Sequence, residues 1–177
     1  MRIHRASASE AAVVSALGRD TYRDHFAGLW QADELSTWLD GQFGESLIRN
    51  DIDNGSACYL ICADDDNWVG YAKLAWQQGV PARAEHGALL QKIYFRAAAT
   101  RSGFGTALLE ACKAQARDAG EACLWLDVLQ SNDRARRFYE RNGFVVIGER
   151  AFARANESLP MWVMHHPLGP TRPTADR

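Results

Sequence analysis

The chain has 177 residues, of which 47% are hydrophobic and 24% charged, and its formal net charge at pH 7 is −2. This length and composition are typical of one globular domain with a sizeable core and argue against intrinsic disorder. The near-neutral charge provides no electrostatic attraction to nucleic acid or to a membrane surface, and we expect neither as a partner.

The start of the chain, MRIHRASASE, lacks the apolar run of a secretory signal, and no segment is apolar for long enough to cross a bilayer. Four cysteines are scattered without a CxxC pair: Cys58, Cys62, Cys112 and Cys123. We therefore expect a cytoplasmic protein with reduced, mostly buried thiols and no metal site.

The first elements in chain order are a strand and several helices. Residues 1–6 predict a short strand, and Ser7 with Glu10 forms an S-x-x-E capping box at the start of a helix. Residues 21–44 are rich in aromatic and acidic side chains and predict two helical pieces around a bend. A shorter helix follows and stops at Asn54-Gly55.

The middle of the chain predicts a hairpin and a further strand. Residues 57–63 and 68–76 have the pattern of two strands joined by the acidic turn 64–67. A loop is expected over 80–87, and a strand over 88–95.

The next segments alternate between helix and strand. Residues 106–119 carry one apolar stripe and predict a helix, whereas residues 122–129 are apolar on both faces and predict a central strand. Ser131 or Asn132 is expected to cap a further helix that stops at Gly143.

The C-terminal part predicts two strands, over 144–149 and 159–166. We expect His165-His166 at a strand edge and not as metal ligands, since no acid or thiol accompanies them at metal-ligand spacing. The expected organisation is a single domain over residues 1–167 and a flexible tail over 168–177.

This order of elements predicts an α/β fold with a mixed sheet. Two strand–helix–strand crossovers make 88–95 and 122–129 parallel neighbours among antiparallel hairpins. We expect a ligand cleft at this pair.

A glycine-containing turn, TRSGFG, leads from the strand 88–95 into the following helix. This geometry directs backbone N–H groups at an anion. A dinucleotide fingerprint would need glycine at Leu108, and a triphosphate-binding loop would need a lysine after Gly105. On the turn alone, a helix entry that merely contains two glycines remains open as an alternative.

The block that follows supplies a more specific pattern. Strand KIYF, turn TRSGFG, a helix, strand LWLDV and the pattern N-x-x-A-x-x-F-Y-x-x-x-G-F follow one another over residues 89–144. This combination resembles the GNAT superfamily of N-acetyltransferases, and most of all its bacterial spermidine/spermine-type small-amine branch. The resemblance implies a mixed, mostly antiparallel sheet with a splayed central parallel strand pair and flanking helices.

The chain departs from the superfamily pattern at three places. Thr100 stands at the first position of the loop motif with Arg101 one place later, and Ala97 replaces a common proline. Leu89 replaces a glutamate often found early in this strand, so the resemblance assigns no base from that strand.

The resemblance implies acetyl-CoA as the cosubstrate and CoA as a product. The backbone of Ile93, Tyr94 and Phe95 would pair with the pantetheine arm. The pyrophosphate would lie on the N–H groups of Arg101, Ser102, Gly103, Phe104, Gly105 and Thr106, at the positive end of the helix.

The implied chemistry is direct attack of an amine on the thioester. The N–H of Phe95 would face the developing oxyanion, and Tyr139 would protonate the departing thiolate. Asn132 would orient the pantetheine, although a plain N-cap explains it equally, just as core packing explains Tyr139. Arg101, Arg134 and Arg137 are either phosphate contacts or residues of a solvated face.

The sequence leaves the general base open. The candidates lie on loops or helix ends and are also explained as surface residues: Asp24, His25, Glu85 and His86. The candidate walls of an acceptor pocket are Tyr22, Phe26 and Trp30, which core packing explains as well.

Together these features predict an N-acetyltransferase acting on a primary amine of a small molecule or polyamine. Acids in residues 19–26 and 64–67 favour a cationic acceptor. A peptide or protein amine is the alternative acceptor, and a non-catalytic CoA-binding regulatory module is the alternative class. A homodimer is a further possibility.

Overall fold

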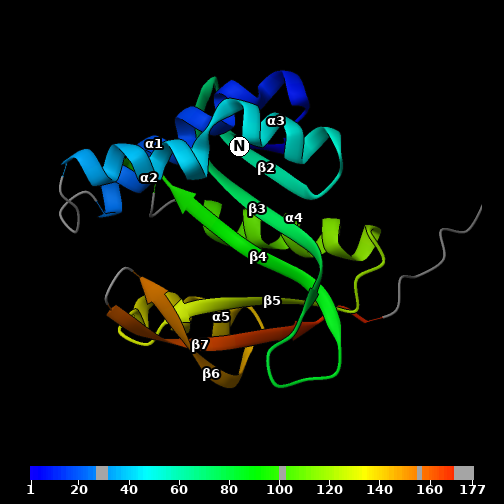
Figure 1. Cartoon of the computed structure of the whole chain (residues 1–177). Coiled ribbons are helices and arrows are strands. Elements are labelled where there is room, and N and C mark those ends of the chain that lie inside the picture. Colours follow the sequence, from blue (N-terminus) through cyan, green and yellow to red (C-terminus); the bar gives the residue numbers. More distant parts are fainter. Residues whose placement is uncertain (27–31, 100–102, 155–156, 170–177) are drawn as a thin grey trace, which may run out of the picture. The chain divides into compact units, whose positions relative to one another are not determined.

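A computed structural model describes residues 1–26, 32–99, 103–154 and 157–169. In this described part, seven strands form one mixed sheet in the order β1-β2-β3-β4-β5-β7-β6 (Figure 1). The strands are β1 (Arg2–Arg5), β2 (Ala57–Asp64), β3 (Asn67–Gly79), β4 (His86–Phe95), β5 (Cys123–Leu129), β6 (Val145–Arg154) and β7 (Glu157–Pro167). The helices are α1 (Ala11–Phe26), α2 (Ala32–Phe43), α3 (Glu45–Asp53), α4 (Phe104–Asp118) and α5 (Asp133–Arg141).

The chain folds into two compact units, each made of two separate stretches of sequence. Unit 1 consists of Met1–Leu74 and Lys92–Cys112, and unit 2 of Ala75–Gln91 and Lys113–Arg177. Strands β3 and β4 and helix α4 each begin in one unit and end in the other. Among the described residues, no helix is long and apolar enough to span a membrane.

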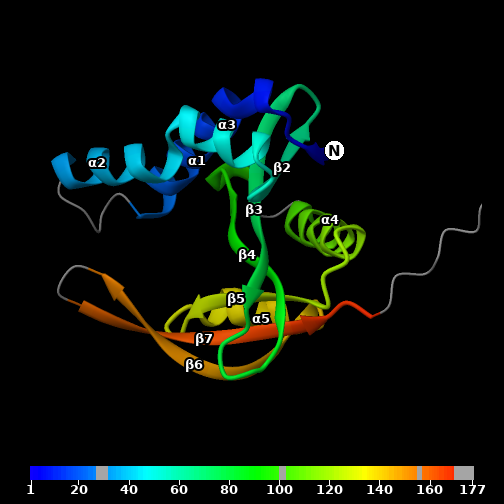
Figure 2. The ribbon, with the colours of Figure 1, turned by 45° about the vertical axis from the view of Figure 1, so that its right-hand side comes forward.

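Unit 1 is built on β1 and β2, which pair antiparallel with Ile3 opposite Cys62. The capping box starts the helical segment as predicted, because the Ser7 N–H donates to the Glu10 carboxylate at 2.9 Å. Figure 2 shows α1, α2 and α3 gathered beside β2. Their apolar faces pack on the strands in one buried cluster, with Leu17, Ile48 and Tyr71 among its members.

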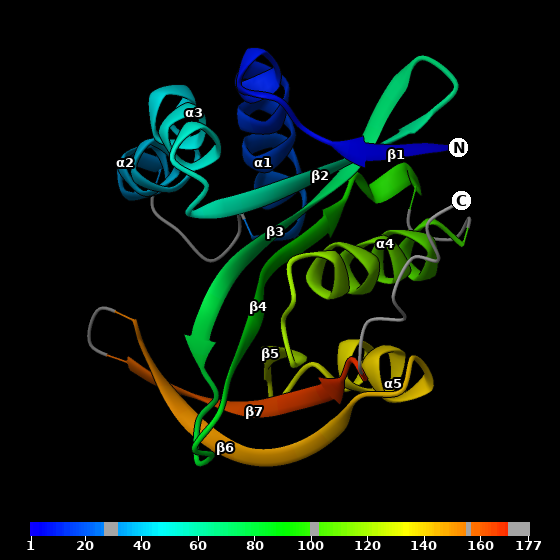
Figure 3. The same ribbon diagram turned by 90° about the vertical axis from the view of Figure 1, so that its right-hand side faces the viewer.

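Unit 2 is built on β5, β7 and β6, which pair antiparallel with one another. The predicted parallel pair is present, since Ala88 and Leu89 of β4 face Leu124 and Trp125 of β5. Figures 2 and 3 both show α5 beside β5 and β7. Leu124 is fully buried, as expected for a strand covered on both faces.

The predicted order and type of these elements are confirmed, with differences at their ends. Helix α4 starts at Phe104, two residues before the prediction, and β6 and β7 continue further into their hairpin. Leu168, which the sequence placed in the tail, is buried and its N–H donates to the Ala122 carbonyl at 3.0 Å. The rest of the predicted tail from residue 170 lies outside the described residues.

Candidate active site

The start of α4 has the geometry of an anion-binding helix entry. Gly103 has a φ of +76°, which favours glycine, and the Ala107 N–H donates to its carbonyl at 3.3 Å. The first turn carries no acidic side chain to occupy its N–H groups. Leu108 and Leu109 are fully buried and anchor the helix. The predicted loop residues Thr100, Arg101 and Ser102 lie outside the described residues.

The end of β4 meets the end of α1 within unit 1. Nε2 of His25 donates to the carbonyl of Phe95 at 2.9 Å, and the Asp24 carboxylate accepts from the Ala97 N–H at 3.3 Å. Arg96 forms an ion pair with Asp20 at 2.9 Å. Two of the predicted base candidates therefore contact the backbone at Phe95–Ala97, where the oxyanion-binding N–H is expected.

The three residues predicted to pair with the pantetheine arm are the last three residues of strand β4. Ile93, Tyr94 and Phe95 are each partly buried. Burial, with a smaller contribution from Tyr22, raises the pKa of Tyr94 to about 12, so this phenol stays protonated at neutral pH.

The residues predicted to wall an acceptor pocket are core residues where the structure describes them. The Tyr22 ring stacks on Trp38 with 4.0 Å between ring centroids and packs beside Phe43. The side chain of Phe26 and the whole of Trp30 lie outside the described part of the chain. Core packing thus accounts for Tyr22.

Helix α5 positions the two polar residues of the N-x-x-A-x-x-F-Y pattern. The Asn132 side-chain oxygen accepts the Ala135 N–H at 3.0 Å, so Asn132 is the N-cap. Tyr139 is 8% exposed, and its ring meets Phe138 and Phe144 edge-on at 5.2 and 5.6 Å. Tyr139 therefore packs in the core, as one of the two explanations predicted, and a catalytic role would be additional to this packing.

The two arginines predicted as phosphate contacts are exposed on α5. Neither Arg134 nor Arg137 forms an ion pair with any residue in the described ranges, whereas Arg136 pairs with Asp133 and Glu140. Both arginines are therefore available to an anion as well as to solvent.

The remaining base candidates lie at the start of β4 in unit 2. His86 is exposed. Glu85 forms an ion pair with His165, with 3.1 Å between Oε1 and Nε2. The expectation that His165 lies at a strand edge without an acid or thiol beside it is wrong. β7 lies between β5 and β6, and Glu85 and Cys123 both adjoin the ring.

Asp127 on β5 is a candidate functional residue that the sequence reasoning missed. Its carboxylate pairs with Arg150, and its Oδ1 is buried without a hydrogen bond from any described residue. Burial raises the pKa of Asp127 above its ordinary range, although the Arg150 guanidinium acts in the opposite direction. A single acid within the apolar run LWLDVL was the signal available in the sequence.

Each unit contains a cavity. A cavity of about 660 Å³ in unit 1 is lined by the acidic β2–β3 turn and the start of α4, including Asp64, Asp65, Asp66, Arg96 and Phe104. A cavity of about 520 Å³ in unit 2 is lined by Gln130, Glu149, Arg150, Ala151, Ser158 and Pro160. The first is lined in part by the acids of the β2–β3 turn, and the second is lined in part by Arg150, the ion-pair partner of Asp127.

The described part of the chain combines a mixed sheet that contains one parallel pair with a helix, α4, that begins directly after a glycine at positive φ. The model of the acetyltransferase (GNAT) family matches residues 20–144, well over half of the sequence. The chain belongs to the acetyltransferase (GNAT) family.

Relatives and solved structures agree with this assignment. An uncharacterized N-acetyltransferase of Lactobacillus delbrueckii subsp. lactis is 22% identical over 158 residues, which is 89% of this chain and 91% of that protein. The PaiA N-acetyltransferase of Thermoplasma acidophilum, solved with coenzyme A, has a TM-score of 0.71 at 18% identity and covers 94% of this chain and 98% of its own. The yncA protein of Salmonella typhimurium, solved with its cofactor acetyl-CoA, has a TM-score of 0.64 at 18% identity, with 99% of both chains covered. At these identities the structural likeness concerns the fold.

Proposed function

We propose that the protein is an acetyl-CoA-dependent N-acetyltransferase that transfers an acetyl group to a primary amine of a small molecule or polyamine. The observation that carries the proposal is the start of α4, where Gly103 at positive φ precedes a first turn without acids. Such a turn suits a diphosphate because its N–H groups and the helix dipole both favour negative charge. Membership of the GNAT family supplies the reaction class.

In this proposal acetyl-CoA binds along the end of β4 and the start of α4, and CoA leaves as a product. The residues proposed to hold it are Ile93, Tyr94, Phe95, Arg101, Ser102, Gly103, Phe104, Gly105, Thr106, Asn132 and Tyr139. Solved neighbours of the same fold that carry coenzyme A or acetyl-CoA support this choice of cosubstrate.

The reaction is direct attack of the neutral amine nitrogen on the thioester carbonyl. The C–N bond forms, negative charge develops on the carbonyl oxygen near the Phe95 N–H, and the C–S bond then breaks. Tyr139 donates its phenolic proton to the thiolate as general acid. The proton that the attacking nitrogen carries passes to a base.

Two side chains of unit 1 suit the role of that base by their position. His25 contacts the Phe95 carbonyl through Nε2, and the Asp24 carboxylate accepts from the Ala97 N–H, so both lie at the backbone where the oxyanion-binding N–H is expected.

The acceptor is proposed to be cationic before it reacts, as in the spermidine/spermine-type branch. Asp20 and Asp24 of α1, which contact Arg96 and Ala97, support this, because carboxylates attract ammonium groups. A peptide or protein amine is the second candidate acceptor, and a CoA-binding regulatory module is the second class.

The proposed location is the cytoplasm. The four cysteines are buried and belong to no disulfide in the described part of the chain, which supports a reducing compartment. A homodimer remains part of the proposal, because β6 is an outer strand with Val145 and Phe152 more than half exposed.

A thiol-release assay with acetyl-CoA across polyamines, amino acids, aminoglycosides and peptides tests the proposal. We expect turnover with polyamines and a fall in kcat of about 10²- to 10⁴-fold in Tyr139→Phe, with acetyl-CoA binding retained. Tyr71→Phe is the matched control, since it removes a buried phenolic oxygen outside the proposed site.

The alternatives give different results in the same assay. Turnover confined to peptides would move the assignment to a protein acceptor. Acetyl-CoA binding with flat rates over the whole panel would indicate the regulatory module, and absence of acetyl-CoA binding by calorimetry would overturn the proposal.

A further inference from the structure

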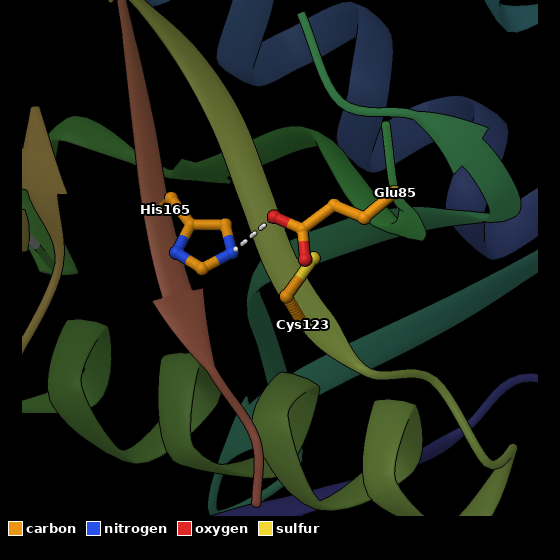
Figure 4. A group of neighbouring side chains, drawn as sticks. All are labelled: Glu85, Cys123 and His165. Atoms are coloured by element: carbon orange, nitrogen blue, oxygen red, sulfur yellow. Dashed lines mark ion pairs between the residues drawn. The ribbon is translucent and has the colours of Figure 1, made fainter. Parts of the chain in front are cut away.

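Three side chains with metal-binding atoms converge in unit 2, each from a different segment (Figure 4). Glu85 lies in the loop before β4, Cys123 opens β5, and His165 lies in β7. One ligand atom of each, a carboxylate oxygen, Sγ and a ring nitrogen, lies within 4.8 Å of the other two. In Figure 4 the His165 ring faces the Glu85 carboxylate, with the Cys123 sulfur beside it.

The backbone fixes this convergence. Trp125 of β5 is directly opposite His165 of β7, so these two side chains lie on the same face of the sheet. Cys123 is two residues before Trp125 and therefore lies on that face as well. The loop is held by two hydrogen bonds, from the Val80 N–H to the Glu85 carbonyl at 3.0 Å and from the Arg83 N–H to the Val80 carbonyl at 3.1 Å.

Gly87 completes the arrangement because it lets β4 approach Cys123. A Cβ at this position would lie 2.3 Å from Sγ and 2.7 Å from the Cys123 carbonyl oxygen, closer than any real contact. The sulfur therefore occupies the place of a side chain at residue 87, next to the loop that carries Glu85.

The cluster holds one polar atom that the described residues leave without a hydrogen bond. Cys123 and His165 are 1% and 5% exposed, and Nε2 of His165 is buried without a hydrogen bond in the described part, although it lies 3.1 Å from Oε1 of Glu85. A buried ring nitrogen without a hydrogen bond is costly, and a cation would satisfy it.

The charged groups at the cluster are two carboxylates and one guanidinium. The Glu85 and Glu121 carboxylates both interact with the Cys123 thiol, and Arg83 forms an ion pair with Glu85 at 3.4 Å. The apolar residues Val80, Trp125 and Val163 surround Cys123 and limit the access of water. The Glu85 side chain is 36% exposed and offers a path from solvent.

We propose that this cluster binds a zinc-type divalent transition-metal ion through Sγ of Cys123, Nε2 of His165 and the carboxylate of Glu85, with water as the fourth ligand. Thiolate, imidazole and carboxylate are the ligands that Zn²⁺ takes, at about 2.0–2.3 Å in a tetrahedral arrangement. The part-exposed Glu85 side chain provides the movement that closes the ligands to these distances. On binding, the thiol loses one proton to solvent, while His165 binds as the neutral ring.

The site has no step in the proposed acetyl transfer, and it is tested without any activity measurement. The full chain is stripped of metal with a chelator and titrated first with Co²⁺ and then with Zn²⁺. We expect one equivalent of Co²⁺ to bind with a thiolate-to-cobalt charge-transfer band, Zn²⁺ to abolish the band, and either metal to raise the thermal unfolding midpoint.

Substitutions of the proposed ligands test whether the metal binds at this cluster. Cys123→Ala should lose the charge-transfer band, and Glu85→Gln, at a part-exposed position where folding is least at risk, should weaken binding about 10- to 100-fold or more. The matched controls are Cys62→Ala, another buried cysteine, and His86→Asn, the neighbour of Glu85; both should bind as the parent does. No band in the parent protein, or a band that survives in Cys123→Ala, would overturn the proposal.

Discussion

At the scale of single residues, the Tyr71 hydroxyl is a buried polar group whose desolvation is not compensated by a hydrogen bond from the described residues. Tyr71 is 0% exposed, and its oxygen forms no hydrogen bond with the described residues. We expect Tyr71→Phe to stabilise the fold by about 1 kcal/mol, because it removes a desolvation penalty and keeps the ring contacts. Urea unfolding checks this, and a loss of stability would show that the hydroxyl has a partner in solution.

Lys92 makes the stability of unit 1 depend on pH. Burial, followed by repulsion from Lys73, lowers the pKa of Lys92 from 10.5 to about 8. Between these values the unfolded chain holds the proton and the folded chain does not, so this residue destabilises the fold fully below about pH 8 and progressively less up to about 10.5.

We expect Lys92→Met to gain stability relative to the parent by about 1–3 kcal/mol on the low-pH side, with the difference shrinking as pH rises through that window. Lys92 also donates to Gln42 at 3.1 Å and lies over the Phe43 ring, so the pH dependence of the difference, and not its absolute value, is the readout. Urea unfolding of both proteins across the window measures it. Parallel stability curves would contradict the assignment.

Residues whose role depends on local sequence were predictable, and residues whose role depends on register were not. The Ser7–Glu10 box is local and was predicted, and the cap of α5 was predicted to be Ser131 or Asn132, of which the structure has Asn132. The contact of His165 with Glu85 and Cys123 requires the β5–β7 register and the conformation of the 80–85 loop, which no spacing along the chain encodes.

At the scale of elements, α5 depends on its N-cap. The Asn132 side chain accepts the Ala135 N–H, which otherwise has no partner in the helix. We expect Asn132→Ala to cost about 1 kcal/mol and Asn132→Ser to cost much less, as measured by thermal unfolding. If Asn132 also orients the pantetheine, both variants weaken acetyl-CoA binding, whereas a pure cap leaves the dissociation constant unchanged.

Element boundaries differ from prediction where the backbone, and not hydrophobic periodicity, sets them. Helix α4 begins at Phe104 because Gly103, at positive φ, is not itself helical but its carbonyl accepts the Ala107 N–H, and Phe104 is itself buried. β6 and β7 run further than their apolar cores because antiparallel pairing continues to Arg154 and Glu157. Backbone hydrogen bonds between two strands can extend both strands, whichever side chains their residues carry.

At the scale of the whole molecule, we expect the two units to unfold together. β3, β4 and α4 each run from one unit into the other, so neither unit can lose its structure without breaking elements of the other. Ile48→Ala in the unit 1 core should cost about 2–5 kcal/mol and accelerate amide exchange in β5 of unit 2 by the same factor as in β2. Hydrogen exchange with mass spectrometry measures both. Faster exchange confined to unit 1 would mean that the units open independently.

The interleaving of the two units has a consequence for how such a gene can change. Each unit is encoded by two separated stretches, so a single crossover between related genes always divides at least one of them between two parents. A crossover within residues 75–112 that avoids the ends of this range divides both units, whereas a crossover at 74/75 or at 112/113 divides only one. Chimaeras joined in the β3–β4 loop should therefore be recovered less often than chimaeras joined at either of those two boundaries.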